Sequence, residues 1–169
     1  MRNHVILAAL AASAAVASPA FAQQASATAE ARGVVLSPLT LTKVTDLDFG
    51  TVAASNVLGT VSVNATSGIR SVTGGVTAVP SAFSRARFDG LAQAATTVQL
   101  TLLPPTGNVL VSGGNTVTVN NMAFDSAGPT RVVPAGGSFT AYVGADFDIA
   151  ANQPNGTYSA LFQVTADYQ

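Results

Sequence analysis

The sequence contains no cysteine and no tryptophan, and its single histidine, His4, lies close to the N-terminus. Disulfide bonds and thiol chemistry are therefore excluded. A serine or cysteine nucleophile would also need a histidine base. Transition-metal centres usually use Cys and His ligands, and we expect His4 to be removed with an N-terminal signal peptide, described below. Only carboxylates remain for chemistry, so we expect no enzymatic activity, no catalytic residue, no cofactor and no metal site.

Charged residues are also scarce. They make up 9% of the chain, far below the roughly 25% of an ordinary soluble domain. The formal net charge is −1, so there is no basic surface for nucleic acid. Hydrophobic residues reach 48%, which argues against disorder. A surface with little charge suits a subunit covered by copies of itself, although secreted β-proteins that replace charge with Thr and Asn have the same composition.

The N-terminal segment has the features of a secretory signal peptide. Arg2 is followed by an apolar run that is too short for a mature membrane anchor, and then by the small-residue triplet Ala20-Phe21-Ala22. We expect cleavage after Ala22 and export through the inner membrane, to the periplasm and then the cell surface. The expected organisation is a signal peptide at 1–22, an extended arm at 23–33 and one domain at 34–169.

The rest of the chain is patterned for β-structure. Apolar residues alternate with a period of two, Gly, Pro and Asn interrupt the runs, and no stretch of the mature chain holds a helical period. Seven to nine short antiparallel strands at this spacing predict an all-β protein with a β-sandwich fold. The predicted strands are residues 34–44, 58–65, 72–79, 83–88, 96–103, 109–112, 116–120, 138–149 and 157–168.

The last predicted strand alternates most regularly. One face is apolar and aromatic and the other is mostly polar, which predicts one buried and one wet face. A strand of this length needs a neighbour, because an open apolar edge aggregates. The apolar face consists of Tyr158, Ala160, Phe162, Val164, Ala166 and Tyr168.

Two carboxylate pairs are the remaining candidates for chemistry. Asp46 with Asp48, and Asp146 with Asp148, are each spaced at i, i+2 and share a strand face. A calcium site would need a curved, oxygen-rich loop that contains glycine, which neither pair provides. We interpret the pairs as solvent-facing residues that discourage edge pairing. The neighbours expected to point inward are Leu47, Phe49, Phe147 and Ile149.

Several segments carry a family resemblance. They are residues 41–52 (LTKVTDLDFGTV), 74–76 (GGV), 152–158 (NQPNGTY) and 162–168 (FQVTADY). They are similar to a bacterial family of secreted domains of unknown function that is grouped with fimbrial subunits. More distantly, they resemble the spore-coat-U-type pilins of chaperone-usher systems. Such pilins end in an alternating strand with an aromatic residue next to last and a glycine near its start, and Tyr168 and Gly156 match these positions.

The resemblance implies an immunoglobulin-like sandwich that lacks its last strand, so that an open groove borders the C-terminal strand. The groove strand would comprise Gly156, Tyr158, Ala160, Phe162, Val164, Ala166 and Tyr168. The implied partners are a periplasmic chaperone, an outer-membrane usher, and copies of the chain or related subunits. The N-terminal arm of the next subunit would enter the groove by strand addition. Its candidate donor residues are Ala25, Ala27, Ala29, Ala31 and Val35.

Some alternatives stay open. The arm offers alanine where pilin donors usually present larger side chains, and alanine buries less apolar area than Val or Leu. The donor could therefore extend to Val35 and Leu36, or the domain could use its own first strand and stay monomeric. The arm also fits a frayed terminus. The alternative function is a self-contained secreted β-sandwich that binds a glycan or another cell-surface ligand. In either case we expect no nucleic-acid partner and no membrane-embedded part.

Overall fold

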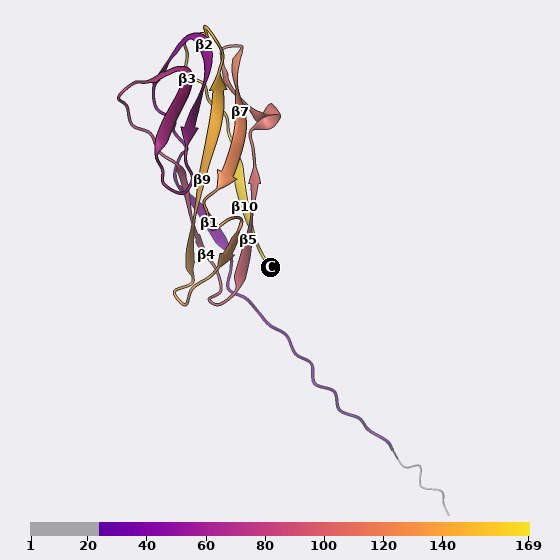
Figure 1. Cartoon of the computed structure of the whole chain (residues 1–169). Helices are drawn as coiled ribbons and strands as arrows, with labels where there is room; N and C mark the ends of the chain where they lie inside the picture. The colour runs from indigo at the N-terminus through magenta and orange to yellow at the C-terminus, as the bar shows by residue number, and fades with distance from the viewer. Residues whose placement is uncertain (1–23) are drawn as a thin grey trace, which may run out of the picture. The chain divides into compact units, whose positions relative to one another are not determined.

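The computed structural model describes residues 24–169, and β-strands dominate it (Figure 1). The predicted signal peptide, residues 1–22, lies outside the described residues. Within the described range there are ten strands and one 3₁₀ turn, η1 (Thr106–Asn108). The strands are β1 (Thr40–Thr45), β2 (Val52–Val63), β3 (Arg70–Ala78), β4 (Ala86–Leu91), β5 (Thr97–Leu103), β6 (Val109–Ser112), β7 (Asn115–Phe124), β8 (Thr130–Val132), β9 (Ser138–Ile149) and β10 (Gln163–Tyr168).

The strands form two antiparallel sheets, as the alternating sequence predicted. The larger sheet has seven strands and is built around β9, which lies between β2 and β7 in Figure 1. β4 pairs with the first half of β9, β2 pairs with its second half, and β7 pairs with its edge opposite β2. β1 and β3 pair with β4 and β2, and β6 pairs with β7. The smaller sheet has the order β10-β5-β8.

The core fills the space between the two sheets, which makes the fold a β-sandwich. Val98 and Leu100 of β5 are fully buried and pack with Phe139 and Ala141 of β9. Odd-numbered residues of β9 face this core while even-numbered ones face outward, because side chains alternate along a strand. The inward positions on β9, which are all buried, are Phe139, Ala141, Val143, Ala145, Phe147 and Ile149.

A buried ion pair ties β8 to the large sheet. The side chains of Arg131 and Asp125 are only 8% and 13% exposed, and Arg131 Nη2 lies 2.8 Å from Asp125 Oδ1. The guanidinium also donates to the carbonyl oxygen of Thr140 on β9. The second carboxylate oxygen of Asp125 accepts a hydrogen bond from the Tyr142 amide. Both charges are therefore paired and hydrogen-bonded, as buried charges must be.

The observed strands differ from the predicted ones in several places. β2 begins at Val52 instead of residue 58, and β7 extends to Phe124 instead of residue 120. The first strand covers only Thr40–Thr45, and residues 34–39 pair with no strand. β8 was not predicted, so the strand count is ten instead of seven to nine. The predicted strand at 157–168 is regular only over Gln163–Tyr168.

The chain divides into two units at a boundary just before β1. Residues 35–169 form one compact unit. The described part of the preceding unit, residues 24–34, has no regular secondary structure, and its side chains are exposed. Its one ion pair, between Arg32 and Glu30, is exposed to solvent. No helix within residues 24–169 has the length and apolar composition of a membrane-crossing helix.

Candidate functional site

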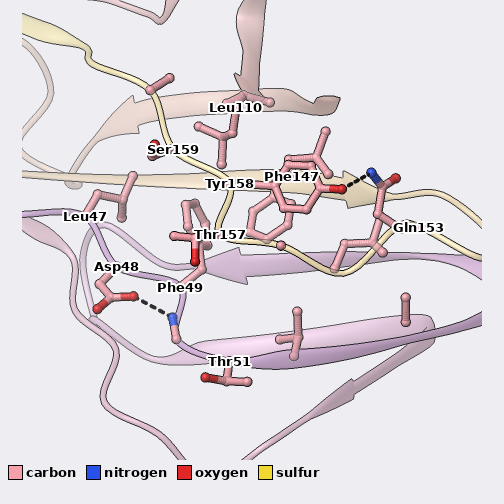
Figure 2. A pocket seen from close by; sticks show the side chains of 18 of the residues that line it. Leu47, Asp48, Phe49, Thr51, Leu110, Phe147, Gln153, Thr157, Tyr158 and Ser159 are labelled. Carbon is pink, nitrogen blue, oxygen red and sulfur yellow. Dashed lines mark hydrogen bonds between the residues drawn. The ribbon is translucent and has the colours of Figure 1, made fainter. Parts of the chain in front are cut away.

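A groove with a volume of about 930 Å³ opens between two stretches of the compact unit (Figure 2). The first wall, residues 47–54, leads from β1 into the start of β2. The second wall, residues 153–162, leads from β9 to β10. The floor consists of apolar side chains from the large sheet: Leu110, Val117, Val119, Met122, Phe147 and Ile149.

The first wall turns two apolar side chains toward the floor. Leu47 and Phe49 pack on the core cluster beneath the groove. The rings of Phe49 and Phe147 meet edge to face, with centroids 4.5 Å apart. Asp48 lies between Leu47 and Phe49 in the sequence, and its carboxylate accepts a hydrogen bond of 2.7 Å from the Gly50 amide (Figure 2). Gly50 has a φ of +70°, and a Cβ there would lie 2.7 Å from the Ala82 carbonyl oxygen, so the turn requires glycine.

Arg70 of β3 holds the first wall in place. Its guanidinium donates to the carbonyl oxygens of Phe49, at 3.1 Å, and Val79, at 3.0 Å. These bonds tie the wall to the connection between β3 and β4. The guanidinium also lies 4.8 Å from the centroid of the Phe83 ring. We therefore expect the wall to be rigid in the unoccupied domain.

The second wall is anchored by Tyr158. Its hydroxyl accepts a hydrogen bond of 2.8 Å from Gln153 Nε2 (Figure 2) and donates one of 2.7 Å to the Pro154 carbonyl oxygen. Its ring packs on the floor cluster. The next residue, Ser159, exchanges two backbone hydrogen bonds with Val111 of β6. The wall is thus attached to the fold along one edge, at a single bridge.

The opposite edge of this segment has no partner strand within residues 24–169. Ser159 bonds to β6, and the odd-numbered residues from 163 to 169 face β5, as the hydrogen bond from the Gln169 amide to the Thr97 carbonyl indicates. Because backbone polar groups alternate in direction along a strand, those of the even-numbered residues point the other way. Extending this alternation back from β10, we expect the amide and carbonyl groups of Tyr158, Ala160 and Phe162 to face the groove.

The groove closes toward the far end of β10. There Leu39 and Leu41, beside and within β1, pack in the same cluster as Ala166 and Tyr168. β1 pairs only with β4, and β10 only with β5, among the strands of the described chain. The two sheet edges therefore meet through side chains at one end, and separate into the groove at the other.

Charge plays little part in this site. Asp48 is the one charged residue among the described residues that line the groove, and its carboxylate is engaged with the Gly50 amide. The remaining lining is aliphatic, aromatic or neutral polar. The groove therefore offers apolar contacts and main-chain hydrogen bonds, which suit an extended neutral peptide better than an ionic ligand.

The family match covers the whole groove. Residues 39–168 match DUF4402, a domain of unknown function. The chain belongs to this family. No curated protein and no solved structure matches the chain.

In this DUF4402 chain the predicted groove residues separate into two groups. Gly156, Tyr158, Ala160 and Phe162 line the groove. The other three belong to core clusters at the closed end, where Val164 packs near Phe162, and Ala166 with Tyr168 packs near Leu100. The predicted donor residues lie before β1, where Val35 is 95% exposed and the exposed alanines are Ala25, Ala27, Ala29 and Ala31.

The carboxylate pairs of the DUF4402 domain do not protect a sheet edge as predicted, because β9 is paired along both edges at Asp146 and Asp148, and Asp46 and Asp48 lie outside the regular strands. Asp148 and Asp146 face outward on β9 and accept hydrogen bonds from the hydroxyls of Thr60 and Ser62 on β2. Asp46 pairs with Lys43 at an exposed position. The inward direction predicted for their apolar neighbours is confirmed. No group of three or more possible metal ligands occurs in the part of the chain that the structure describes.

A separate ion pair lies on the outer face of the large sheet. Arg87 donates two hydrogen bonds to the Asp89 carboxylate, at 2.9 and 2.8 Å. These bonds lower the pKa of Asp89, and the hydroxyl of Thr140 acts in the same direction. The side chains are about two-fifths exposed, so the pair has a small effect on stability.

Sequence reasoning missed the first wall and most of the floor. The signal was present in Leu47 and Phe49, which alternate just before Gly50. Nothing local indicates that this segment lies opposite residues 153–162, because that juxtaposition depends on the packing of both sheets.

Proposed function

We propose that this chain is a structural, pilin-like subunit of a surface fimbria, assembled by donor-strand exchange. In this proposal the N-terminal arm of one copy, or of a related subunit, enters the groove of another. The supporting observation is the apolar groove beside Tyr158, Ala160 and Phe162, in a segment that pairs with a strand only at the Ser159 bridge. An added strand would pair with this segment and cover the floor, which is the β-augmentation mode of peptide recognition.

The arm has the character of such a strand. Its alanines alternate with Ser26, Thr28 and Glu30, so one face is small and apolar while the other is polar. Closer to β1, Val34 and Val35 are 87% and 95% exposed. Val35 lies on the same face as the arm alanines, so burial of that face in another copy would remove its side chain from water.

Main-chain hydrogen bonds would supply most of the binding energy. The three edge residues offer up to six backbone groups, and each bond contributes about 0.5–1.5 kcal/mol net. Each buried alanine methyl adds about 0.8 kcal/mol. The four alanines together therefore contribute about 3 kcal/mol, and Val35 adds more. An alanine-rich donor therefore depends mainly on the edge pairing to offset the entropy lost when the arm is ordered.

The remaining parts of the proposal follow from this role. The chain would be exported by its signal peptide and would act structurally, without catalysis. A periplasmic chaperone would cover the open groove until an outer-membrane usher brings the next subunit. Its final location would be the cell surface.

The first test is assembly of the mature protein. We expect purified residues 23–169 to form ladders on electrophoresis that resist SDS without heating, and to lose them when residues 23–31 are deleted. A variant with serine at all four arm alanines keeps the arm length and should weaken the ladders. Unchanged ladders after the deletion would exclude the arm as donor. A stable monomer at every concentration would favour the self-contained, ligand-binding sandwich.

A further inference from the structure

Three residues connect the beginning of the compact unit to the end of β10. The hydroxyl of Tyr168 donates a hydrogen bond of 2.7 Å to the Ser37 carbonyl oxygen and accepts one of 2.8 Å from the Gln93 amide. The Ser37 hydroxyl donates to Gln93 Oε1 at 2.9 Å, which completes the triangle. We call this arrangement the latch. It lies at the closed end of the groove, where Tyr168 and Leu41 belong to one cluster.

The latch fixes Ser37, the point at which the arm joins the compact unit, beside the end of β10. β1 runs from the closed end, near Ser37, toward the first wall at Leu47. β10 runs in the opposite direction, from the second wall to Tyr168. Any strand that folds back from Ser37 toward the groove of its own domain would consequently run parallel to β10. Parallel pairing is slightly less stable than antiparallel pairing, and a strand from another copy is free to enter antiparallel.

A folded-back arm would also fill only part of its own groove. Ser37 and Leu47 are ten residues apart, or about 33 Å along an extended strand. An arm folded back along β1 would use about ten residues to cover the same distance, and would place residue 27 or so beside Leu47. Only the first few residues of the mature arm would then reach the groove. At this end of the groove, Leu41 of β1 and Ala166 of β10 pack against the same core cluster.

We infer that the latch of Ser37, Gln93 and Tyr168 directs the arm to the groove of a second copy by preventing it from folding back into its own. This inference rests on the proposed function, because it assumes that the groove accepts a strand. It goes further in assigning a positioning role to Tyr168, whose hydroxyl lies outside the groove. It also favours exchange between copies over self-complementation, the two alternatives that the sequence left open.

Tyr168→Phe tests the latch, because it removes two hydrogen bonds and keeps the packed ring. Tyr142→Phe is the matched control, since the hydroxyl of Tyr142 makes no hydrogen bond within residues 24–169 and its ring lies on the outer face beneath Arg85. Ser37→Ala removes the third hydrogen bond of the latch, from the Ser37 hydroxyl to Gln93 Oε1, and leaves Tyr168 unchanged. Circular dichroism melting checks that each mature variant is folded.

Two measurements are made on each full mature chain over a range of concentrations. One is the fraction in SDS-resistant ladders. The other is the rate of trypsin cleavage after Arg32, whose side chain is 82% exposed. For the wild-type chain and Tyr142→Phe, we expect rapid cleavage in dilute monomer and protection that appears only with assembly.

Loss of two hydrogen bonds favours the unlatched form by about tenfold or more. For Tyr168→Phe we therefore expect the fraction of monomer in which Arg32 is protected to rise about tenfold, independently of concentration, and the amount of ladder to fall accordingly. Ser37→Ala should shift both readouts in the same direction by a smaller factor.

The outcomes separate the two claims. If Tyr168→Phe forms ladders and is cleaved like the wild-type chain, the latch has no such role. If wild-type monomer is protected at every dilution, the arm folds back by default and the inference is wrong, although the groove still accepts a strand. If no variant forms ladders and every arm is cleaved as fast as a synthetic arm peptide, the proposed function itself fails.

Discussion

Odd- and even-numbered residues of an extended arm lie on opposite faces, and this alternation allows strand addition to be tested by amino-acid substitution. If the alanine face of the arm covers the groove floor, Ala29→Asp places a carboxylate against aliphatic and aromatic side chains, whereas Thr28→Asp places it on the opposite face. The two variants have the same length and the same net charge. They differ only in which face of the added strand carries the new charge.

The expected difference is large. Ala29→Asp loses one buried methyl, about 0.8 kcal/mol, and adds the cost of burying an unpaired carboxylate, which is several kcal/mol. A loss of about 3–4 kcal/mol weakens binding by roughly 200- to 900-fold. Thr28→Asp changes an exposed position and should alter binding by no more than about 0.5 kcal/mol.

The assay uses synthetic peptides of residues 24–36 that compete with a labelled wild-type peptide for a chain lacking residues 23–31. Fluorescence anisotropy gives the affinity of each peptide. Equal losses for Ala29→Asp and Thr28→Asp would refute the reasoning, because they would show that the arm does not bind as a two-faced strand.

Two further predictions concern the fold that frames the groove. A Cβ at Gly90 would lie 2.1 Å from Cζ of Phe139, so Gly90→Ala should cost about 1–3 kcal/mol of unfolding free energy in urea titrations, while Gly136→Ala, with open space around it, should cost no more than about 0.5 kcal/mol. The depressed pKa of Asp89 predicts that its pairing with Arg87 stabilises the fold at neutral pH and that this contribution disappears as the pH falls through the folded-state pKa, which lies below the ordinary value of an aspartate. The melting temperature of the wild-type chain should therefore be slightly higher than that of Asp89→Asn at pH 7, and the two should converge in acid. A difference in melting temperature that widens in acid would contradict the assignment.

Much of the strand pattern could be predicted from the sequence, because alternation and turn residues are local signals. β9 was predicted with the bounds that it has, and so was β6. β8 was missed because it has only three residues, follows Pro129, and is held by the buried pair of Arg131 with Asp125. Such a strand depends on long-range packing, which periodicity does not report.

The groove shows the same difference between features that local sequence signals predict and features that depend on long-range packing. Regular alternation predicted a strand over 157–168, and the chain has the side-chain pattern throughout. Residues 157–162 still lack a ladder, since one edge meets β6 only at Ser159 and the other faces the groove. Strand propensity is thus encoded locally, whereas the presence of a pairing partner is not. The latch could not be predicted either, because Ser37, Gln93 and Tyr168 are far apart in the sequence.

The most direct test of strand exchange between copies is disulfide trapping, for which a chain without cysteine is well suited. Cysteine is placed at Ala27, Ala29 or Ala31 in one tagged copy and at Ala160, in the second wall, in another. After mixing and mild oxidation, we predict a disulfide-linked pair that contains both tags for at least one arm position. Cysteine at Thr28 should give far less of it. Absence of the mixed pair at every position, in a preparation that nonetheless forms ladders, would contradict the account.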